Sequence, residues 1–462
     1  MSKLPESVLA GYLTTLQQRP IAQATRDRLA QALLDWFTAG WSGSPMPLAA
    51  TMRALAADTM PGEGRAAVFG GGTMTPPGAA FANAAIAHLR EIDDAHRAAM
   101  LHPGVIAISP VLALAAGGNL SQRRVADAIV AGYEVSLRIG EALGTGHAAK
   151  FHATATAGAV GAAAAVGVAL GLDTEQLHHA MGIGATQAAG LWQLVDDDAH
   201  ESKSLHPAFA VRNGIHAAFA ARAGLPGAQG FVTGARGLYA LLSADGPLQA
   251  LVNDLDGPER INTATIKAWP CCAQLFTPLD ATRALLDEHR FVPDEIVSVE
   301  IEIFPHALKI AGVVWPAKPA ETCFSLRYVV ATLLSRGKIG IEDMETPALD
   351  SPALLALAER IKVTTSDVFQ QAFPQKRPAS VRITLRDGRQ VEALRELRRG
   401  DPEDPYDWPA LQARMRAFAP AMDDHAAQHV ASWCAGFADA ECDNEPCNVP
   451  PSLFSAPARA VR

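Results

Sequence analysis

Four short stretches of the chain gather side chains that could move protons or bind anions. The first runs from Glu91 through Asp93 and Asp94 to His102 and a Pro-Gly pair. Histidine titrates near neutral pH and often acts as an acid or base, and a nearby carboxylate can orient it. The other three stretches are Lys150-Phe151-His152, Ser202-Lys203-Ser204-Leu205-His206 and Lys267-Ala268-Trp269-Pro270-Cys271-Cys272. Together they supply the groups that acid–base chemistry on an anionic substrate needs.

Each stretch also has an ordinary structural interpretation. Adjacent acids such as Asp93 and Asp94 commonly lie on a solvated surface, and a histidine beside a helix, such as His152, often caps it or packs in a core. Chemistry is favoured because every stretch borders a very apolar helix. The chain has no GxSxG, P-loop or HExxH motif. A His/Asp metal site stays open on composition, but no ligand pair has diagnostic spacing, so we expect no metal.

Composition excludes several classes of protein. The 462 residues are 49% hydrophobic and 19% charged, with a net charge of -9, which argues against a general nucleic-acid surface. The longest apolar run, residues 153–172, is rich in Ala and Gly and predicts a buried helix, not a membrane span. The six cysteines form no CxxC pair, and the first residues, MSKLPESVLAGYL, lack the pattern of a signal peptide. We expect a cytoplasmic protein with reduced thiols.

The elements that must position the four stretches are mostly helices up to about residue 268. Thr25–Gly43 has apolar residues at helical spacing, and Ser121–Leu143 begins with a Ser N-cap. Asp173 can cap a helix that runs through Gly182, and Val211–Gly224 is an Ala-rich amphipathic helix.

The pattern changes after residue 268. Glu295–Phe304 alternates, which predicts a half-buried strand with Val297 on the same side as Val299, Ile301 and Ile303. A hairpin is predicted around an Asp-Gly turn, and one more strand and two helices are indicated. These segments are Ser380–Leu385, Arg389–Ala393, Ile361–Thr364, Phe324–Ser335 and Pro352–Arg360.

The fold expected from these elements is mainly α, with two domains. Residues 1–268 plus 403–462 form a large all-helical domain, because helical patterns return over residues 403–435. Residues 269–402 form a smaller α+β domain, which the family resemblance described below makes a lid.

The four stretches, in this order, resemble the MmgE/PrpD family over nearly the whole chain. The segments that carry the resemblance are LLDWFTAGWSG, IDDAHRAAMLHPG, FHATATAGAVGAAAAVGVALG, SKSLHPAFAVRNG and KAWPCC. Each matches a family segment, and the ordered set is more specific than any one of them.

The resemblance implies a homodimer of two-domain subunits, with the site between the helical domain and the lid. It implies a cofactor-independent enzyme acting on a small di- or tricarboxylate. The family activities are 2-methylcitrate dehydration, cis-aconitate decarboxylation and iminodisuccinate epimerisation. We therefore expect a lyase that dehydrates or decarboxylates next to a carboxylate, with no nucleic-acid or membrane partner.

The resemblance also implies roles for individual residues. His102 is the acid or base, oriented by Asp93 or Asp94, and His152 and Lys203 are further catalytic partners. Cations and hydrogen-bond donors would bind the substrate carboxylates and stabilise the charge that develops beside them. The implied substrate-binding residues are Glu91, His206, Lys267, Cys272 and Tyr328.

Three positions depart from the family pattern. Ala95 stands where dehydratases and decarboxylases carry Thr or Ser, Cys272 where decarboxylases carry His, and Glu91 where the family carries Asp. The spacing from Asp94 to His102 and the Trp-Pro-x-Cys element look more like the epimerase branch. An epimerase of an imino- or amino-dicarboxylate is the first alternative. The second alternative is an inactive helical binding protein, and the third is a metal-dependent hydrolase.

Four further polar residues of the first stretch are interpreted as surface or supporting residues. They are His88, Arg90, His96 and Arg97.

Overall fold

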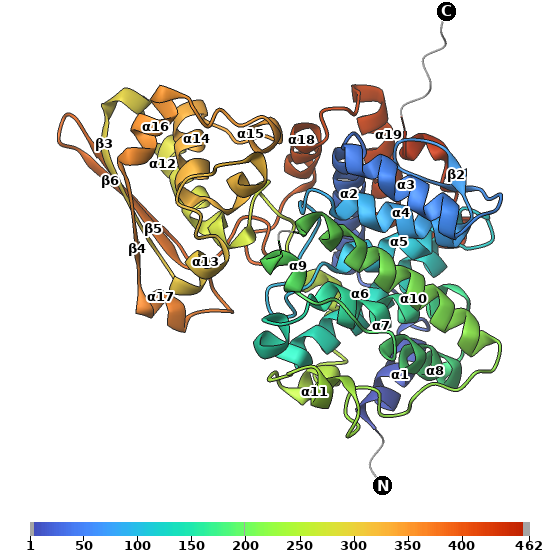
Figure 1. Ribbon diagram of the computed structural model, residues 1–462. Coiled ribbons are helices and arrows are strands. Elements are labelled where there is room, and N and C mark those ends of the chain that lie inside the picture. The colour runs from blue at the N-terminus through green and yellow to red at the C-terminus, as the bar shows by residue number, and fades with distance from the viewer. Residues whose placement is uncertain (1–3, 198, 456–462) are drawn as a thin grey trace, which may run out of the picture. The chain divides into compact units, whose positions relative to one another are not determined.

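The chain divides into two compact units in a computed structural model that describes residues 4–197 and 199–455 (Figure 1). Unit 1 comprises residues 1–264 and 408–462, and unit 2 comprises residues 265–407. The expected fold class is confirmed, because the described residues are mainly helical and the larger of their sheets lies in unit 2. Among the described residues, no helix has the length and apolar character needed to cross a membrane.

The core of unit 1 is built around one buried helix. Helix α7 (Ala153–Ala169) is buried along its whole length and packs against α5 (Pro103–Ala115), α6 (Gln122–Ala148) and α10 (Leu205–Arg222). Its Ala and Gly residues let the neighbouring backbones approach closely. The apolar run is therefore a core helix, as expected.

Most expected helices of unit 1 are confirmed, with changes at their ends. Asp173 caps its helix with a capping box, and Ser121 caps α6, which continues past a kink at Gly144 to Ala148. Helix α10 begins six residues before the expected Val211, at Leu205, because a proline in its first turn costs no helical hydrogen bond. The other helices are α1 (Pro5–Leu16), α2 (Gln23–Gly43), α3 (Pro47–Thr59), α4 (Pro76–His88), α8 (Thr174–Ala185), α9 (Gln193–Asp196), α11 (Leu238–Leu241), α18 (Trp408–Phe418) and α19 (Asp424–Ala435).

Unit 1 is not purely helical. Strands β1 (Ala66–Ala67) and β2 (Thr73–Met74) form a small antiparallel pair. Residues 68–72 join them, and the last three of these, all glycines, have positive φ, from 85° to 105°. The sequence did not predict these strands, because each is only two residues long and too short to show an alternating pattern.

Unit 2 holds a four-stranded sheet in the order β4 (Ile361–Thr365), β3 (Ile296–Ile303), β5 (Ala379–Leu385) and β6 (Gln390–Arg395). The β3–β4 pair is parallel and the other two pairs are antiparallel. The hairpin around the Asp-Gly turn is confirmed, and Gly388 has the φ of +86° that such a turn favours.

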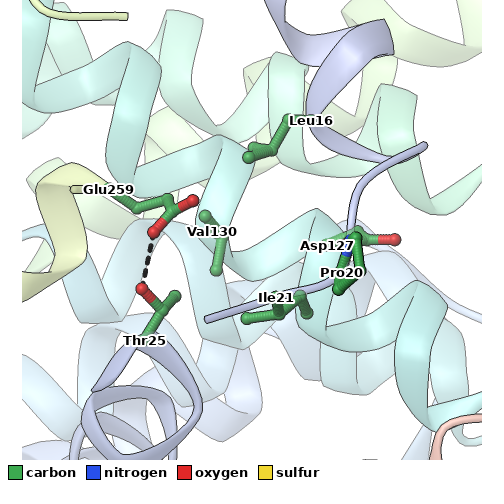
Figure 2. A pocket seen from close by; sticks show the side chains of 7 residues that line it. All are labelled: Leu16, Pro20, Ile21, Thr25, Asp127, Val130 and Glu259. Carbon is green, nitrogen blue, oxygen red and sulfur yellow. Dashed lines mark hydrogen bonds between the residues drawn. The ribbon is translucent and has the colours of Figure 1, made fainter. Parts of the chain in front are cut away.

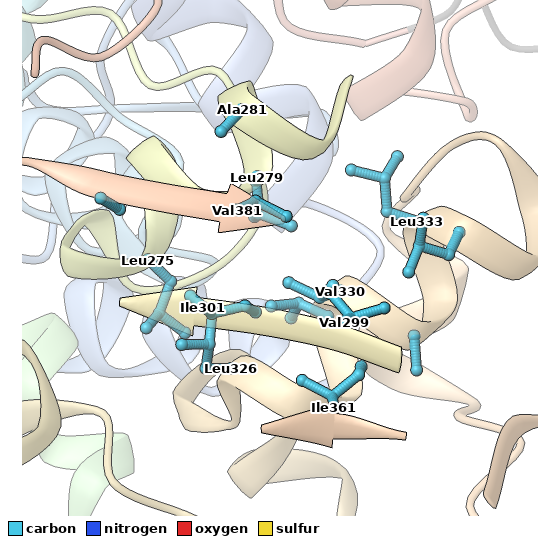
Figure 3. Close-up of a cluster of buried hydrophobic side chains, with 14 of the residues drawn as sticks. Leu275, Leu279, Ala281, Val299, Ile301, Leu326, Val330, Leu333, Ile361 and Val381 are labelled. Carbon is cyan, nitrogen blue, oxygen red and sulfur yellow. The ribbon is translucent and has the colours of Figure 1, made fainter. Parts of the chain in front are cut away.

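Helices cover the sheet of unit 2. Figure 3 shows Val299 and Ile301 of β3 facing Val330 and Leu333 of α14 (Leu326–Arg336) across a core of aliphatic side chains. The other helices of this unit are α12 (Phe276–Glu288), α13 (Pro305–Ile310), α15 (Glu342–Glu345), α16 (Pro352–Glu359) and α17 (Asp367–Gln371).

One residue of β3 faces the opposite way from the prediction. Val297 is 52% exposed, whereas its neighbour Ile296 is 1% exposed. The pairing of β3 with β5 shifts register between Ile296 and Ser298. An irregularity of this kind reverses the alternation of side chains, so only residues after Ser298 follow the predicted pattern.

Replacing Gly161 of α7 with alanine tests the close packing of unit 1. The added Cβ would lie 2.6 Å from Cβ of Ser136 on α6, so we expect the free energy of unfolding to fall by about 1–3 kcal/mol. Urea unfolding followed by circular dichroism measures it. Gly11→Ala is the matched control: a Cβ there meets no atom within 4 Å, so alanine should stabilise α1 by up to about 1 kcal/mol. Equal effects of the two substitutions would contradict the packing argument.

Candidate active site

His102 and Asp93 lie side by side in unit 1. His102 is the N-cap residue of α5, with Pro103 at the first helical position. Its Nδ1 lies 3.2 Å from Oδ2 of Asp93, and 12% of its side chain is exposed against 1% for Asp93. The backbone N–H of His102 donates to Oγ1 of Thr154 at 3.1 Å, which ties the start of α5 to α7. A partly exposed imidazole with a buried carboxylate behind it is suited to proton transfer.

His88 shares the same carboxylate. It is the last residue of α4, it is 1% exposed, and its Nδ1 lies 2.9 Å from Oδ2 of Asp93. Burial alone would raise the pKa of Asp93, but His88 and His102 together hold that pKa well below its usual range. Of the two interpretations given to His88, surface or supporting residue, its position agrees with the supporting one, and a histidine that ends an apolar helix is the signal that could have pointed to its burial.

Asp94 has a different set of partners. Its Oδ2 accepts from the Tyr133 hydroxyl at 2.6 Å, and its Oδ1 accepts from the backbone N–H of Gly104 at 2.8 Å. A Cβ on residue 104 would lie 2.7 Å from that Oδ1, so only glycine allows this approach. Burial and the charge of Asp35 raise the pKa of Asp94 to about 7. Asp94 thus fastens the start of α5 to α6, while Asp93 contacts His102.

His152 and His206 form a second pair of imidazoles. His152 is the N-cap residue of α7, and its Nδ1 lies 3.1 Å from Nδ1 of His206, so one ring donates and the other accepts. Its Nε2 lies 2.8 Å from Oγ1 of Thr154. Burial and Lys203 lower the pKa of His152 well below its usual range, and burial with the charge of Lys203 lowers the pKa of His206 to about 4. Both rings are therefore neutral at neutral pH.

Lys203 brings a cation to the same region. It lies in the short 3₁₀ helix His200–Ser204 before α10, and its ammonium forms an ion pair with Glu91. The ammonium also lies 5.8 Å from the ring centroid of Trp192, whose ring is 4.7 Å from that of His152. Trp192 and Thr154 are thus two neighbours of the site that sequence analysis missed. Glu91 has φ of +52°, an uncommon backbone conformation for a residue other than glycine.

The other predicted substrate-binding residues belong to unit 2. Lys267 is 4% exposed, and Cys272 is partly buried, with its backbone N–H donating to the carbonyl of Cys323 at 2.9 Å. Tyr328 is 1% exposed, and its hydroxyl donates to the carbonyl of Asp343 at 2.6 Å. Burial raises the pKa of Tyr328.

Three of the histidines could approach a metal ion. Nitrogen atoms of His88, His102 and His152 lie within 4.8 Å of one another. Zinc bound at about 2.0–2.1 Å in a tetrahedral site needs ligand atoms about 3.4 Å apart. Both nitrogens of His152 already have partners, so the group would fit a metal only after that ring turned.

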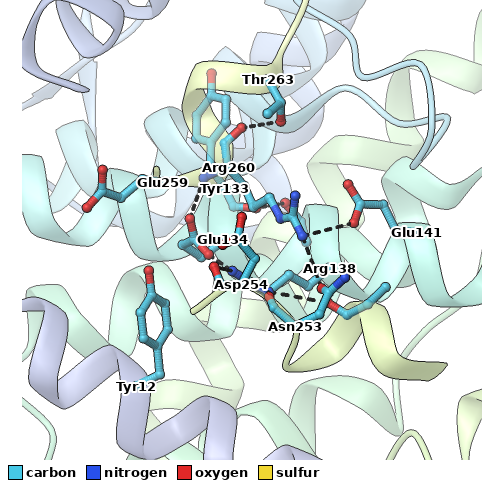
Figure 4. A network of polar contacts seen from close by, with 12 residues as sticks. Tyr12, Tyr133, Glu134, Arg138, Glu141, Asn253, Asp254, Glu259, Arg260 and Thr263 are labelled. Atoms are coloured by element: carbon cyan, nitrogen blue, oxygen red, sulfur yellow. Dashed lines mark hydrogen bonds and ion pairs between the residues drawn. The ribbon is translucent and has the colours of Figure 1, made fainter. Parts of the chain in front are cut away.

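A buried polar network supports the loop that carries His102. Within α6, Arg138 donates to Glu134 at 2.7 Å, and it also donates to the carbonyl of Asn253 at 2.6 Å (Figure 4). His96 joins the loop to this region, since its Nε2 lies 3.0 Å from Oγ1 of Thr263. His96 is 5% exposed, so of the two interpretations given to it, surface or supporting residue, the supporting one agrees with the structure.

A small hollow in unit 1 is separate from the histidines. Figure 2 shows its lining, which includes Leu16, Ile21 and Val130 with Glu259 at one side, where Thr25 donates to the Glu259 carboxylate at 2.6 Å. Its volume of 10 Å³ is no more than one water needs, and none of the candidate site residues lines it.

Comparison with known proteins identifies the family to which the chain belongs. The MmgE/PrpD N-terminal domain matches residues 7–250, and the MmgE/PrpD C-terminal domain matches residues 269–434. The chain belongs to the MmgE/PrpD family. It is 25% identical over 411 residues to a cis-aconitate decarboxylase of Aspergillus terreus, covering 83% of each chain. It is 26% identical over 424 residues to a cis-aconitate decarboxylase-like protein of Aspergillus oryzae, covering 85% of this chain and 86% of that one.

Acidification tests the low pKa of His206. Its folded pKa of about 4 lies below the unfolded value near 6.5, so the unfolded chain binds the proton first as the pH falls. His206 therefore contributes its full stabilisation above about pH 6.5, and this contribution is lost as the pH falls toward about 4. Between pH 7 and pH 5, we expect the free energy of unfolding to fall by about 2 kcal/mol because of His206. Urea unfolding of wild type and His206→Asn at both pH values measures it. The pH 7 pair serves as the baseline, and equal losses in both proteins would contradict the assignment.

Proposed function

We propose that the protein is a cofactor-independent lyase that dehydrates or decarboxylates a small di- or tricarboxylate next to a carboxylate group. The observation that carries the proposal is the partly exposed His102 with the buried Asp93 behind it. The family match and the cis-aconitate decarboxylases among the relatives support this chemistry. The expected homodimer and cytoplasmic location remain predictions.

His102 is the acid–base group in this proposal. Its Nδ1 faces Asp93, so the proposal assigns proton exchange with the substrate to Nε2. In a dehydration, the base takes a proton from the carbon beside a carboxylate, the C–O bond to the neighbouring carbon breaks, and the acid protonates the departing hydroxyl group, which leaves as water. In a decarboxylation, the C–CO₂ bond breaks, the electron pair passes into the conjugated carboxylate, and the acid then protonates carbon. Either reaction moves a proton at a carbon beside a carboxylate.

Lys203 binds a substrate carboxylate in the same proposal. An ammonium group has three donors, so a substrate oxygen can join Glu91 on Lys203 or replace it. The positive charge then stabilises the negative charge that builds up during bond breaking. Lys267, Cys272 and Tyr328 stay proposed substrate-binding residues of unit 2.

An epimerase is the second candidate function. His102 and His152 lie at the N-termini of two different helices, with ring centroids 6.1 Å apart, so two imidazoles could serve as acid and base. Ala95 favours this alternative, because a hydroxyl group found in dehydratases and decarboxylases is missing there.

A substrate panel in heavy water separates the two functions. Methylcitrate, cis-aconitate, citrate and iminodisuccinate would each be followed by NMR. A lyase forms an alkene or releases CO₂, whereas an epimerase places deuterium in recovered substrate without either product. Turnover of none of these compounds would contradict the lyase proposal.

Replacing His102 with asparagine tests its role. We expect kcat to fall by at least about 100-fold, because a positioned acid–base group contributes that much or more. Steady-state kinetics on the active compound measures it, and circular dichroism checks folding. His216→Asn is the matched control: His216 is exposed and bonds within α10 to the carbonyl of Arg212 at 2.7 Å, so activity should not change. Full activity of the His102 variant would assign the acid–base role to another residue.

Replacing Lys203 with methionine tests carboxylate binding. The variant loses the charge-assisted hydrogen bond to the substrate carboxylate, and the negative charge of Glu91 loses its ion pair with Lys203. We therefore expect KM to rise about 10- to 100-fold. Initial rates over a range of substrate concentrations measure it. Lys150→Met is the control, since its ammonium bonds to the exposed Ser243 hydroxyl at 3.0 Å. A KM that changes equally in both variants would argue against a specific role for Lys203.

A further inference from the structure

His88 is buried behind the candidate active site, and the proposed reaction does not use it. It is 1% exposed, whereas 12% of the His102 side chain is exposed. His88 therefore has almost no surface with which to contact a substrate, and any part it plays must act through a neighbour.

Both imidazoles contact the same carboxylate oxygen. Oδ2 of Asp93 lies 2.9 Å from Nδ1 of His88 and 3.2 Å from Nδ1 of His102. The two rings meet edge to face, with centroids 4.7 Å apart. An ionised carboxylate can only accept, so each Nδ1 that faces it carries a proton. The His88 contact has the geometry of a hydrogen bond, whereas Nδ1 of His102 lies only at ion-pair distance from the same oxygen. The hydrogen bond from His88 therefore reduces the attraction of Oδ2 for the His102 proton.

The contacts of His88 keep its proton on Nδ1. Its Nε2 is buried without a hydrogen-bond partner among the described residues, and a buried N–H there would be left unsatisfied. Oδ1 of Asp93 is also buried without a hydrogen-bond partner among the described residues. Both histidines therefore contact the carboxylate at Oδ2. The sharing is therefore a fixed feature of the packing.

We propose that His88 is a positioning residue that, by sharing Oδ2 of Asp93, weakens the hold of this carboxylate on the His102 proton and makes His102 a weaker base. The proposal rests on the proposed role of His102 as the acid–base group. It gives His88 a role in setting the pH at which the enzyme works, without contact with substrate.

Other ionisable groups surround His88, Asp93 and His102, and all of them are retained in the His88 variants described below. They come from the neighbouring helices and loops of unit 1: Asp35, Glu91, Asp94, His152, Lys203 and His206. A difference between variants at position 88 therefore reports on the shared carboxylate.

Two substitutions of His88 separate hydrogen bonding from packing. His88→Leu fills similar space without a donor, whereas His88→Asn keeps an N–H near the position of Nδ1. In His88→Leu, we expect the titration midpoint of His102 to rise by about 0.5–1 pH unit, with the acid limb of kcat/KM moving the same way. In His88→Asn, both should stay near wild type. NMR of histidine-labelled protein follows the titration, with the His102 signal assigned from His102→Asn.

Two results would overturn the proposal. One is an unchanged His102 midpoint in His88→Leu, and the other is an equal shift in His88→Leu and His88→Asn, which would indicate packing alone. The NMR titration needs no substrate. If the wild-type protein turned over no polycarboxylate, the proposed function would fail, and the His102 midpoint would still decide the role of His88.

Discussion

The site in unit 1 depends on one buried carboxylate. Asp93 lies almost without solvent between two imidazoles, and a charge in such a place is stable only when cations or donors surround it. Keeping it ionised requires His88 from the end of α4 and His102 from the start of α5 to meet at one oxygen. The packing of these two helices is thus coupled to the protonation of the site.

The N-termini of two helices bring the imidazoles together. His102 caps α5 and His152 caps α7, and Thr154 contacts both residues. The positive end of a helix disfavours a proton on a nearby imidazole and favours an anion. The low pKa of His152 agrees with a region that keeps its rings neutral until negative charge arrives. Ala and Gly residues along α7 allow this approach, because larger side chains would hold the helices apart.

Sequence patterns predicted the elements better than the contacts between them. Asp173 and its helix could be predicted because a capping box is local. Asp93 and Asp94 are adjacent, and their different partners depend on Tyr133, which lies 39 residues further along the chain. His88 could not be distinguished from a surface histidine until α4 was packed against α5. Val297 was misplaced because a register shift depends on the partner strand.

The order of the chain has a consequence for how the protein is made. Unit 1 is interrupted by unit 2, and its last segment, from Trp408, packs back onto α2 near the beginning. There Arg414 forms a buried ion pair with Asp35 at 2.8 Å, and Trp41 donates to the carbonyl of Leu453 at 2.8 Å. On the ribosome, α2 must wait for more than 350 residues to be synthesised before these partners exist. Unit 2 can finish folding earlier, because its whole sequence emerges before Trp408. The N-terminal helices of unit 1 therefore stay exposed longest during synthesis, and they are the part of the chain that a chaperone would protect.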